Sequence, residues 1–551
     1  MTTALERGTP TNSAERPWWR DCVTYQIYLR SFADGDGDGI GDIGGIRSRL
    51  GYLADLGVDA VWITPWYRSP MLDGGYDVAD YRDIDPRFGT LDEAVQLFTE
   101  AHRHGIRVLI DIVPNHTSWE HPWFREALAG GPGSAARERY IFRPGRGPGG
   151  AEPPSDWQAV FGGPAWERTD DGEWYLHLFD PSQPDLNWEH PEVRAEFDSI
   201  LRFWLDLGAD GVRVDVAHGM VKDFSFGDFA GRPQRFDSGA SRVGHPFWDR
   251  DGVHEITREF RRVIDAYDDR MMVAEARVPP DRLPLYLRPD EYHQAFNFDL
   301  LDAPWSAHRF AEIIEQSCRS SAAAVGALPT WVLSNHDVMR HATRYSLPYG
   351  TDWRTWPAVG PYDLLDAALG ARRARAAALV TLSLPGSVYI YQGDELGLPE
   401  YWDLPPECID DPTWTRSGHT ERGRDGCRIP MPWSGIGPSL GFSPGDAVPW
   451  LPQPASYAEL AADRQAGDPD SMLELYRTAI AVRRELLAGC DEIEMLSAPP
   501  EVMAYGRGTG FACVVNMGTD AAPMPEGELL LSSGPVDGRL PGDTAVWLRR
   551  D

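Results

Sequence analysis

The sequence of 551 residues has little positive charge and almost no lysine. It contains 84 acidic residues against 52 basic ones, and Lys222 is its only lysine, which leaves a formal net charge of −32. Because such a charge repels nucleic acids and anionic membranes, we expect neither as a partner. The composition is compatible with a small neutral substrate, although it does not identify one.

Long hydrophobic runs and organised cysteines are also lacking. Residues 1–20 contain no apolar segment of the kind found in secretory signals, and no run reaches the about 18 apolar residues of a membrane-spanning helix. The six cysteines include no CxxC pair and are scattered along the chain, which is typical of reduced thiols. We therefore expect a cytoplasmic protein.

What the chain does contain is a series of short apolar, β-branched runs, each followed by a helix-like stretch. Eight such units predict an α/β fold, a (β/α)8 TIM barrel whose active site lies at the carboxyl ends of the strands. A doubly wound open sheet is the alternative, but polar residues at nearly every strand exit favour the closed barrel. The predicted strands are 22–29, 60–66, 107–116, 211–217, 271–276, 295–301, 330–337 and 387–396.

Three stretches do not follow this alternation. Residues 1–17 read as a polar, disordered leader. Residues 117–187 are rich in Gly, Pro and Trp and too long for one loop, which predicts a small insert domain after the third strand. Residues 490–551 contain β-prone runs between turns and predict a C-terminal antiparallel β-sandwich. The barrel would then comprise residues 18–116 and 188–489.

The segment GVRVDVAHG at 211–219 places an arginine beside a carboxylate. Side chains two positions apart on a strand point the same way, so Arg213 and Asp215 share one face. A neighbouring guanidinium lowers the pKa of a carboxyl group and keeps it ionised, which suits a nucleophile better than an acid. For this segment alone, a buried structural ion pair is the alternative.

Other predicted strands end in similar side chains. Glu275 follows the apolar run 271–274, and partial burial would keep it protonated as a general acid. Carboxylates whose environments differ in this way are typical of an acid and base pair. The strand exits together supply a possible acid/base site, made of Arg213, Asp215, Glu275, His116, His336 and Asp337.

Four ordered segments strongly resemble the hallmark regions of glycoside hydrolase family 13, the α-amylase family. A fifth segment, QPDLNW at 183–188, is similar to a region of the oligo-1,6-glucosidase-like subgroup. The resemblance covers about residues 20–551. The four segments are DIVPNH at 111–116, GVRVDVAHG at 211–219, VAEA at 273–276 and VLSNHD at 332–337.

The resemblance implies a role for each of these residues. Asp215 would be the nucleophile, Glu275 the acid/base, and Asp337 a carboxylate that binds sugar hydroxyls in the transition state. Asp111 and Asn115 resemble the family's structural pair. Taken alone, each histidine would more often have a structural role. The implied substrate-binding residues are Asp73, Tyr76, His116, Phe179, Arg213, His336 and Arg428.

The sequence departs from the family at one place close to the acid. Where the family usually has a tryptophan two residues after the acid, this chain has Arg277. The departure concerns the subsite for the leaving group and leaves the predicted chemistry unchanged.

An acidic loop at 34–42 has carboxylates at alternate positions, as Ca²⁺-binding loops do. The bidentate glutamate of an EF-hand is absent, since Gly45 stands at its place. Within the family the loop resembles a structural Ca²⁺ (or Mg²⁺) site, and an acidic turn without metal is the alternative. In neither case is the metal catalytic, and no organic cofactor is expected. The implied ligands are Asp34, Asp36, Asp38, Asp42 and the carbonyl oxygen of Ile40.

The resemblance implies an exo-acting, retaining α-glucosidase that acts on short malto- or isomalto-oligosaccharides. A transglucosidase or sucrose-isomerase-type enzyme of the same family is the first alternative. The second is an inactive barrel-shaped binding or accessory protein, which would tolerate loss of the carboxylates and commonly carry a membrane span.

Two features of the sequence predict different linkage preferences. Val216 resembles the residue that follows the nucleophile in α-1,6-cleaving relatives, whereas the segment at 423–433 resembles bacterial maltases. We expect α-1,4 activity with some α-1,6 tolerance.

The loop at 71–77 predicts the exo specificity. Asp73 and Tyr76 match the family's exo-glucosidase pattern, with Tyr76 under the sugar ring and Asp73 at the far hydroxyls. A buried carboxylate needs a cation, and Arg428 is the predicted partner. A solvated loop charge is the alternative for Asp73.

Overall fold

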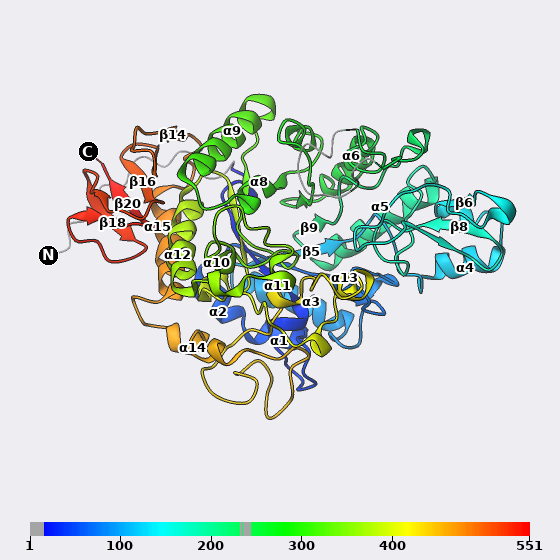
Figure 1. The fold of residues 1–551 in the computed structure, drawn as a ribbon, viewed down its shortest axis with the longest axis horizontal. Helices are drawn as coiled ribbons and strands as arrows, with labels where there is room; N and C mark the ends of the chain where they lie inside the picture. Colours follow the sequence, from blue (N-terminus) through cyan, green and yellow to red (C-terminus); the bar gives the residue numbers. More distant parts are fainter. Residues whose placement is uncertain (1–15, 232–233, 235–243, 551) are drawn as a thin grey trace.

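The computed structural model describes residues 16–231, 234 and 244–550 (Figure 1). Of the predicted leader at 1–17, only the last two residues lie within these ranges. Eight parallel strands close into a barrel, which confirms the predicted TIM barrel. In order around the barrel they are β1 (Val23–Ile27), β2 (Ala60–Ile63), β5 (Arg107–Ile112), β9 (Gly211–Val214), β10 (Met271–Ala274), β11 (Gln294–Asn297), β12 (Thr330–Val332) and β13 (Ser387–Tyr391).

The barrel strands are packed on both faces, as expected for a parallel sheet covered by helices. Apart from Arg107, every residue in them is buried. The packing of β9 against β10 requires a glycine, because a Cβ atom on Gly211 would lie 2.2 Å from the carbonyl oxygen of Met271. The apolar runs of the sequence therefore became the core.

The strands end earlier than predicted. The range 295–301 was wrong at its end, because β11 stops at Asn297 and the helix α8 (Phe298–Asp302) follows. The side-chain oxygen of Asn297 accepts a hydrogen bond from the N–H of Leu300 and so caps this helix. Asp215, Glu275 and Asp337 likewise lie in the loops just beyond the strands. Asp111 and Arg213 lie within β5 and β9.

Helices cover the outside of the barrel. Their ends carry ordinary capping residues: the side chain of Thr90 and that of Glu93 form a capping box at the start of α3. The longer helices are α1 (Ile43–Ser48), α2 (Leu50–Leu56), α3 (Leu91–Arg103), α5 (Pro191–Leu207), α6 (Val253–Ile264), α9 (Ala307–Val325), α12 (Ala367–Ser383) and α15 (Met472–Leu486). Short ones are α7 (Leu283–Tyr286), α10 (His341–Arg344), α11 (Trp356–Val359), α13 (Pro412–Arg416) and α14 (Ala462–Gln465).

The chain between β5 and α5 forms a small substructure, drawn in cyan at one end of Figure 1. It contains the helix α4 (Pro122–Gly130) and an antiparallel sheet of β6 (Phe142–Pro144), β8 (Glu173–Leu176) and β7 (Trp166–Arg168). A further hairpin, β3 (Tyr67–Arg68) and β4 (Asp80–Ile84), flanks the loop at 71–77.

The C-terminal strands form antiparallel sheets at the opposite end, drawn in red in Figure 1, which confirms the predicted β domain. They are anchored on α12, where Trp547 and Tyr505 donate hydrogen bonds to the carbonyl oxygens of Leu379 and Val380. Across the described ranges, no helix is long and apolar enough to cross a bilayer. The strands are β14 (Glu494–Met495), β15 (Val502–Arg507), β16 (Phe511–Asn516), β17 (Ala522–Pro523), β18 (Glu528–Ser532), β19 (Arg539–Leu540) and β20 (Thr544–Arg549).

Candidate active site

Two carboxylates stand side by side where β9 and β10 end. Val214 and Ala274 are partners in the register of these parallel strands and are also their last residues. Asp215 and Glu275 follow them directly, so both side chains start from the same rim of the barrel. This is the rim at which the active sites of such barrels lie.

Arg213 joins these two carboxylates to a third. Its Nη1 atom donates to Asp215 (2.6 Å) and Asp111 (2.9 Å), and its Nη2 atom donates to Glu275 (2.9 Å). The arginine side chain is 2% exposed, that of Asp215 8% and that of Glu275 17%. Exposure therefore increases toward Glu275, the side from which a substrate can approach.

The electrostatics differ from the expectation for Asp215. Burial raises the pKa of Asp215, and the opposing effect of Arg213 does not reverse the rise. Arg213 lowers this pKa, as predicted, but the net shift in the free site is upward, because burial and the charges of Glu275 and Asp111 act against it. Burial likewise raises the pKa of Asp111 to about 6.

The backbone of Val216 is strained and donates a second hydrogen bond to Glu275. Val216 has a φ of 45°, a conformation that a β-branched residue adopts at a cost of about 1–3 kcal/mol. Its N–H donates to Oε2 of Glu275 at 3.0 Å. A Cβ atom on Gly219 would lie 2.6 Å from Val216 and 2.7 Å from Trp248, so the turn also depends on that glycine.

Asp337 lies among cations. Burial raises its pKa, but the positive charges of neighbours such as Arg424 and Arg428 oppose this effect, and the pKa of Asp337 stays below its ordinary value. Arg424 contacts one of its oxygens at 3.1 Å and Arg428 contacts the same oxygen at 3.3 Å. Asp337 is therefore an ionised hydrogen-bond acceptor at neutral pH.

Asp73 is buried and paired, but with a different arginine from the one predicted. Arg424 donates to Oδ1 of Asp73 at 2.6 Å, and Gln183 donates to Oδ2 at 2.9 Å. Arg428 instead donates to the carbonyl oxygen of His336. Arg424 is four residues earlier and also contacts Asp337 and Asp411, so it can bridge from one side of the site to the other.

The remaining predicted binding residues lie in the same neighbourhood. The ring of His336 stacks on that of Tyr76, with centroids 5.3 Å apart, and Tyr76 donates to Asp111 at 3.0 Å. The ring of His116 lies 5.1 Å from that of Phe179. Burial lowers the pKa of each histidine to about 3, so both rings are neutral near pH 7.

The only lysine is a buried cross-link beneath this site. Nζ of Lys222 lies 2.7 Å from Asp185 and donates to Asn115, also at 2.7 Å. Burial lowers the pKa of Lys222, an effect that Asp185 opposes. Since Asn115 follows β5 and Asp185 ends the insert, the lysine ties the insert to the barrel.

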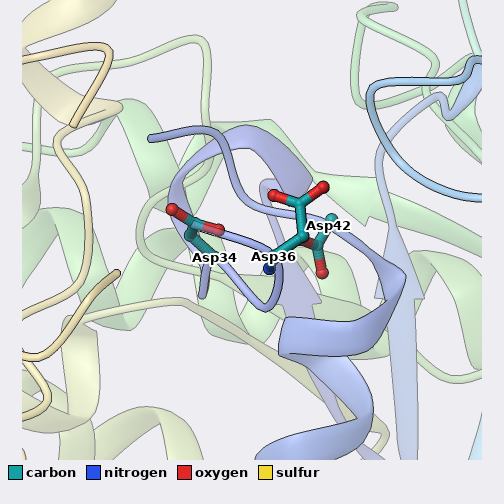
Figure 2. A group of neighbouring side chains, drawn as sticks. All are labelled: Asp34, Asp36 and Asp42. Atoms are coloured by element: carbon teal, nitrogen blue, oxygen red, sulfur yellow. Dashed lines mark hydrogen bonds between the residues drawn. The ribbon is translucent and has the colours of Figure 1, made fainter. Parts of the chain in front are cut away.

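The acidic loop lies between β1 and α1. Oxygens of Asp34, Asp36 and Asp42 lie within 4.8 Å of one another, and Figure 2 shows these three side chains on one loop. Burial raises the pKa of Asp42, so a bound cation would relieve an unfavourable charge. Asp38, also within the described chain, lies outside this group and accepts the N–H of Ile40.

Sequence reasoning missed several residues of the site. Arg424 and Gln183 were within quoted segments, the first at 423–433 and the second in QPDLNW, so position in a segment could have indicated them. Phe161 lies in the insert, where its ring centroid is 4.8 Å from the guanidinium of Arg424 and 5.8 Å from the ring of Phe179. No motif in the sequence indicated this residue.

Comparison with known proteins identifies the family. A family profile described as "Alpha amylase, catalytic domain" matches residues 26–489. The chain is 37% identical to a "Probable alpha-glucosidase" of Rhizobium meliloti (strain 1021), over 92% of this chain and 91% of that protein. It is 35% identical to an "Oligo-1,6-glucosidase" of Parageobacillus thermoglucosidasius, over 90% and 89% respectively.

A similar solved structure is that of the α-glucosyl transfer enzyme XgtA. It has a TM-score of 0.84 and 33% sequence identity, and the match covers 98% of this chain and all of that one. These similarities extend over the barrel, the insert and the C-terminal sheets. The chain belongs to glycoside hydrolase family 13, the α-amylase family, and is a glycoside hydrolase.

Proposed function

We propose that the protein is an exo-acting, retaining α-glucosidase that releases glucose from the non-reducing end of short oligosaccharides. The observation that carries the proposal is the guanidinium of Arg213, which binds both Asp215 and Glu275. Retaining enzymes have carboxyl groups about 5–5.5 Å apart, whereas inverting ones leave about 6.5–9.5 Å for a water. Two carboxylates on one guanidinium match the closer spacing.

In the first step Glu275 donates its proton to the glycosidic oxygen while Asp215 attacks the anomeric carbon. The leaving group departs as an alcohol, and a β-glucosyl ester forms on Asp215. In the second step Glu275 removes a proton from water, which attacks the anomeric carbon and releases α-glucose. Arg213 and the N–H of Val216 orient Glu275 in both steps.

The buried end of the site supports exo action. Asp73, Arg424 and Gln183 form a hydrogen-bonded group, and Phe161 lies on the guanidinium of Arg424. Such a group would bind the hydroxyls at the non-reducing end of one glucose. It would also block the path that a longer chain needs, so that Asp337 and the histidines act on a terminal residue.

For linkage we propose α-1,4 activity with some α-1,6 tolerance. The two relatives have names that differ in the linkage they specify: one is a probable α-glucosidase and the other is an oligo-1,6-glucosidase. A comparison of kcat/KM on maltose and isomaltose decides the question. A strong preference for isomaltose would contradict the proposal.

Transglucosylation is the second candidate, because XgtA is described as an α-glucosyl transfer enzyme. The same covalent intermediate serves both reactions, and they differ only in whether water or a sugar attacks it. Analysis of products at high maltose concentration separates them: we expect glucose to predominate over longer oligosaccharides.

We also propose a structural Ca²⁺ (or Mg²⁺) ion at Asp34, Asp36 and Asp42, which are hard oxygen ligands. The ion would neutralise the acidic loop and would take no part in the reaction. A cytoplasmic location is proposed from the six free cysteines of the described chain.

The test of function is hydrolysis of p-nitrophenyl α-glucoside. We expect the Asp215→Ala variant to lose this activity while it keeps the melting temperature of a folded protein. Azide should restore release of p-nitrophenol and give β-glucosyl azide, since it attacks from the face that Asp215 occupied. An active Asp215→Ala variant, without azide, would show that the nucleophile is another residue.

A further inference from the structure

Arg277 stacks on the ring of Phe298 just beyond the carboxyl ends of β10 and β11. Arg277 comes two residues after Glu275, beyond β10, and Phe298 is the first residue after β11. These strands are parallel neighbours, with Val273 opposite Gln294. The guanidinium of Arg277 lies 4.0 Å from the centroid of the Phe298 ring, within the range of a cation–π contact.

The stack lies close, along the chain, to two of the carboxylates of the site. Phe298 belongs to an apolar cluster that also contains Val338, and Val338 directly follows Asp337. Arg277 is thus two residues from Glu275 in the chain, and Phe298 shares an apolar cluster with the neighbour of Asp337.

The charges around this stack do not balance. Nη1 of Arg277 lies 3.4 Å from Oδ2 of Asp302, and Arg354 lies 3.8 Å from the other oxygen of the same carboxylate. That second oxygen is buried and accepts no hydrogen bond within the described chain. Two cations thus share one carboxylate through long contacts, which leaves an excess positive charge on a protein of net charge −32.

We propose that Arg277 and Arg354 bind an anionic group, a carboxylate or phosphate, on the leaving group of the substrate. This rests on the proposed α-glucosidase function and adds a substrate class to it. The guanidinium fork of an arginine binds oxyanions through two parallel hydrogen bonds, and stacking on Phe298 fixes its orientation. An anion in this place would gain shorter contacts than Asp302 provides.

The reaction itself is unchanged by this recognition. Glu275 still gives its proton to the glycosidic oxygen, and the leaving group departs as an alcohol. The carboxylate or phosphate of the leaving group takes no part in this step. Arg277 and Arg354 act on substrate binding and on its orientation. A loss of either charge should therefore appear mainly in KM, and high salt should weaken the effect.

The experiment compares 4-carboxyphenyl α-glucoside with its neutral isostere, 4-carbamoylphenyl α-glucoside. We expect the parent to prefer the carboxylate at low salt. Arg277→Gln should lower kcat/KM at least about tenfold more for the carboxylate than for the carbamoyl substrate, since it removes a charge-assisted hydrogen bond. Arg277→Lys should keep part of the preference, because it keeps the charge.

Two further measurements make the outcome decisive. Trehalose and trehalose 6-phosphate form a second neutral and anionic pair, and show whether a phosphate or a carboxylate is preferred. Arg143→Gln removes an arginine stacked 4.4 Å from Phe224 on an exposed part of the chain, and should leave both preferences as in the parent.

Hydrolysis of α-glucosyl fluoride separates this inference from the proposed function. The fluoride leaving group offers nothing for Arg277 to hold. If the parent hydrolyses it but shows no preference for either anionic substrate, the inference is wrong and the glucosidase stands. Equal losses on both members of each pair in Arg277→Gln also overturn it, since they indicate a structural role. A parent that does not hydrolyse the fluoride would overturn both.

Discussion

Removal of the only lysine should destabilise the protein strongly. The proposed change is Lys222→Met, which keeps an unbranched side chain of similar length but removes the charge. Asp185 and Lys222 are 0% and 1% exposed, so solvent cannot replace the lost partner. The N–H of Leu178 and the side-chain amide of Asn115 would still donate to Asp185, at 2.8 and 3.1 Å.

The expected magnitude follows from these contacts. Breaking a buried ion pair by removing one partner costs about 3–5 kcal/mol, because a charge is left buried without compensation. Two remaining hydrogen bonds place the expected loss toward the lower end, about 3 kcal/mol. The double variant Lys222→Met/Asp185→Asn should recover part of that loss, since it leaves no charge in the site.

The assay is unfolding in guanidinium chloride at pH 7, followed by tryptophan fluorescence. Arg372→Met is the matched control, because Arg372 is exposed on α12, and it should change the free energy of unfolding by less than about 0.5 kcal/mol. A Lys222→Met variant within about 1 kcal/mol of the parent would refute the reasoning. A double variant worse than the single one would do the same.

Three other predictions concern the pocket, the metal and a buried histidine. Asp73→Ala should reduce the transition-state stabilisation that kcat/KM on maltose reports by at least about 2 kcal/mol, because it removes a charged acceptor and leaves Arg424 with fewer partners. Asp55→Ala on the exposed face of α2 is the control, and parental turnover by Asp73→Ala would disprove the proposed role of Asp73 in binding the sugar. Chelation by EDTA should lower the melting temperature and added Ca²⁺ should restore it, since the ion binds the folded state; indifference to both argues against the metal. Burial lowers the pKa of His293 to about 3, whereas the unfolded chain has a value near about 6.5. The contribution of this neutral ring to stability is thus complete above pH about 6.5 and is lost as the pH falls toward 3. The stability advantage of the parent over His293→Gln should shrink by up to about 1.4 kcal/mol per pH unit below that value, and a difference independent of pH contradicts this.

Much of the fold could be predicted because its signals are local. The eight apolar runs became the eight barrel strands, and apolar runs of this kind have no alternative but burial. Strand ends were less predictable. Phe298, Leu300 and Leu301 were predicted as part of a strand because they are apolar, yet they lie in the helix α8. The side chain of Asn297 caps that helix, which is a contact that periodicity does not contain.

Pairing between distant residues was the harder part of the site. The segments placed Asp73 and an arginine of 423–433 in one pocket, but the choice between Arg424 and Arg428 depends on how the loop after β13 turns. The same applies to Asp215, whose nearest cation was predicted while the two other carboxylates on that cation were not. Burial and sharing of charge are properties of the assembled rim.

The central claim is that Asp215 forms a covalent bond with the sugar while Glu275 supplies the proton. Incubation with 5-fluoro-α-glucosyl fluoride, followed by digestion and mass spectrometry, tests it most directly, because the fluorine slows hydrolysis of the intermediate. The account predicts a fluoroglucosyl ester on the peptide that contains Asp215, at the carboxylate held 2.6 Å from Arg213. A label on a different carboxylate, or turnover of the reagent with no covalent adduct and β-configured sugar as the first product, would contradict it.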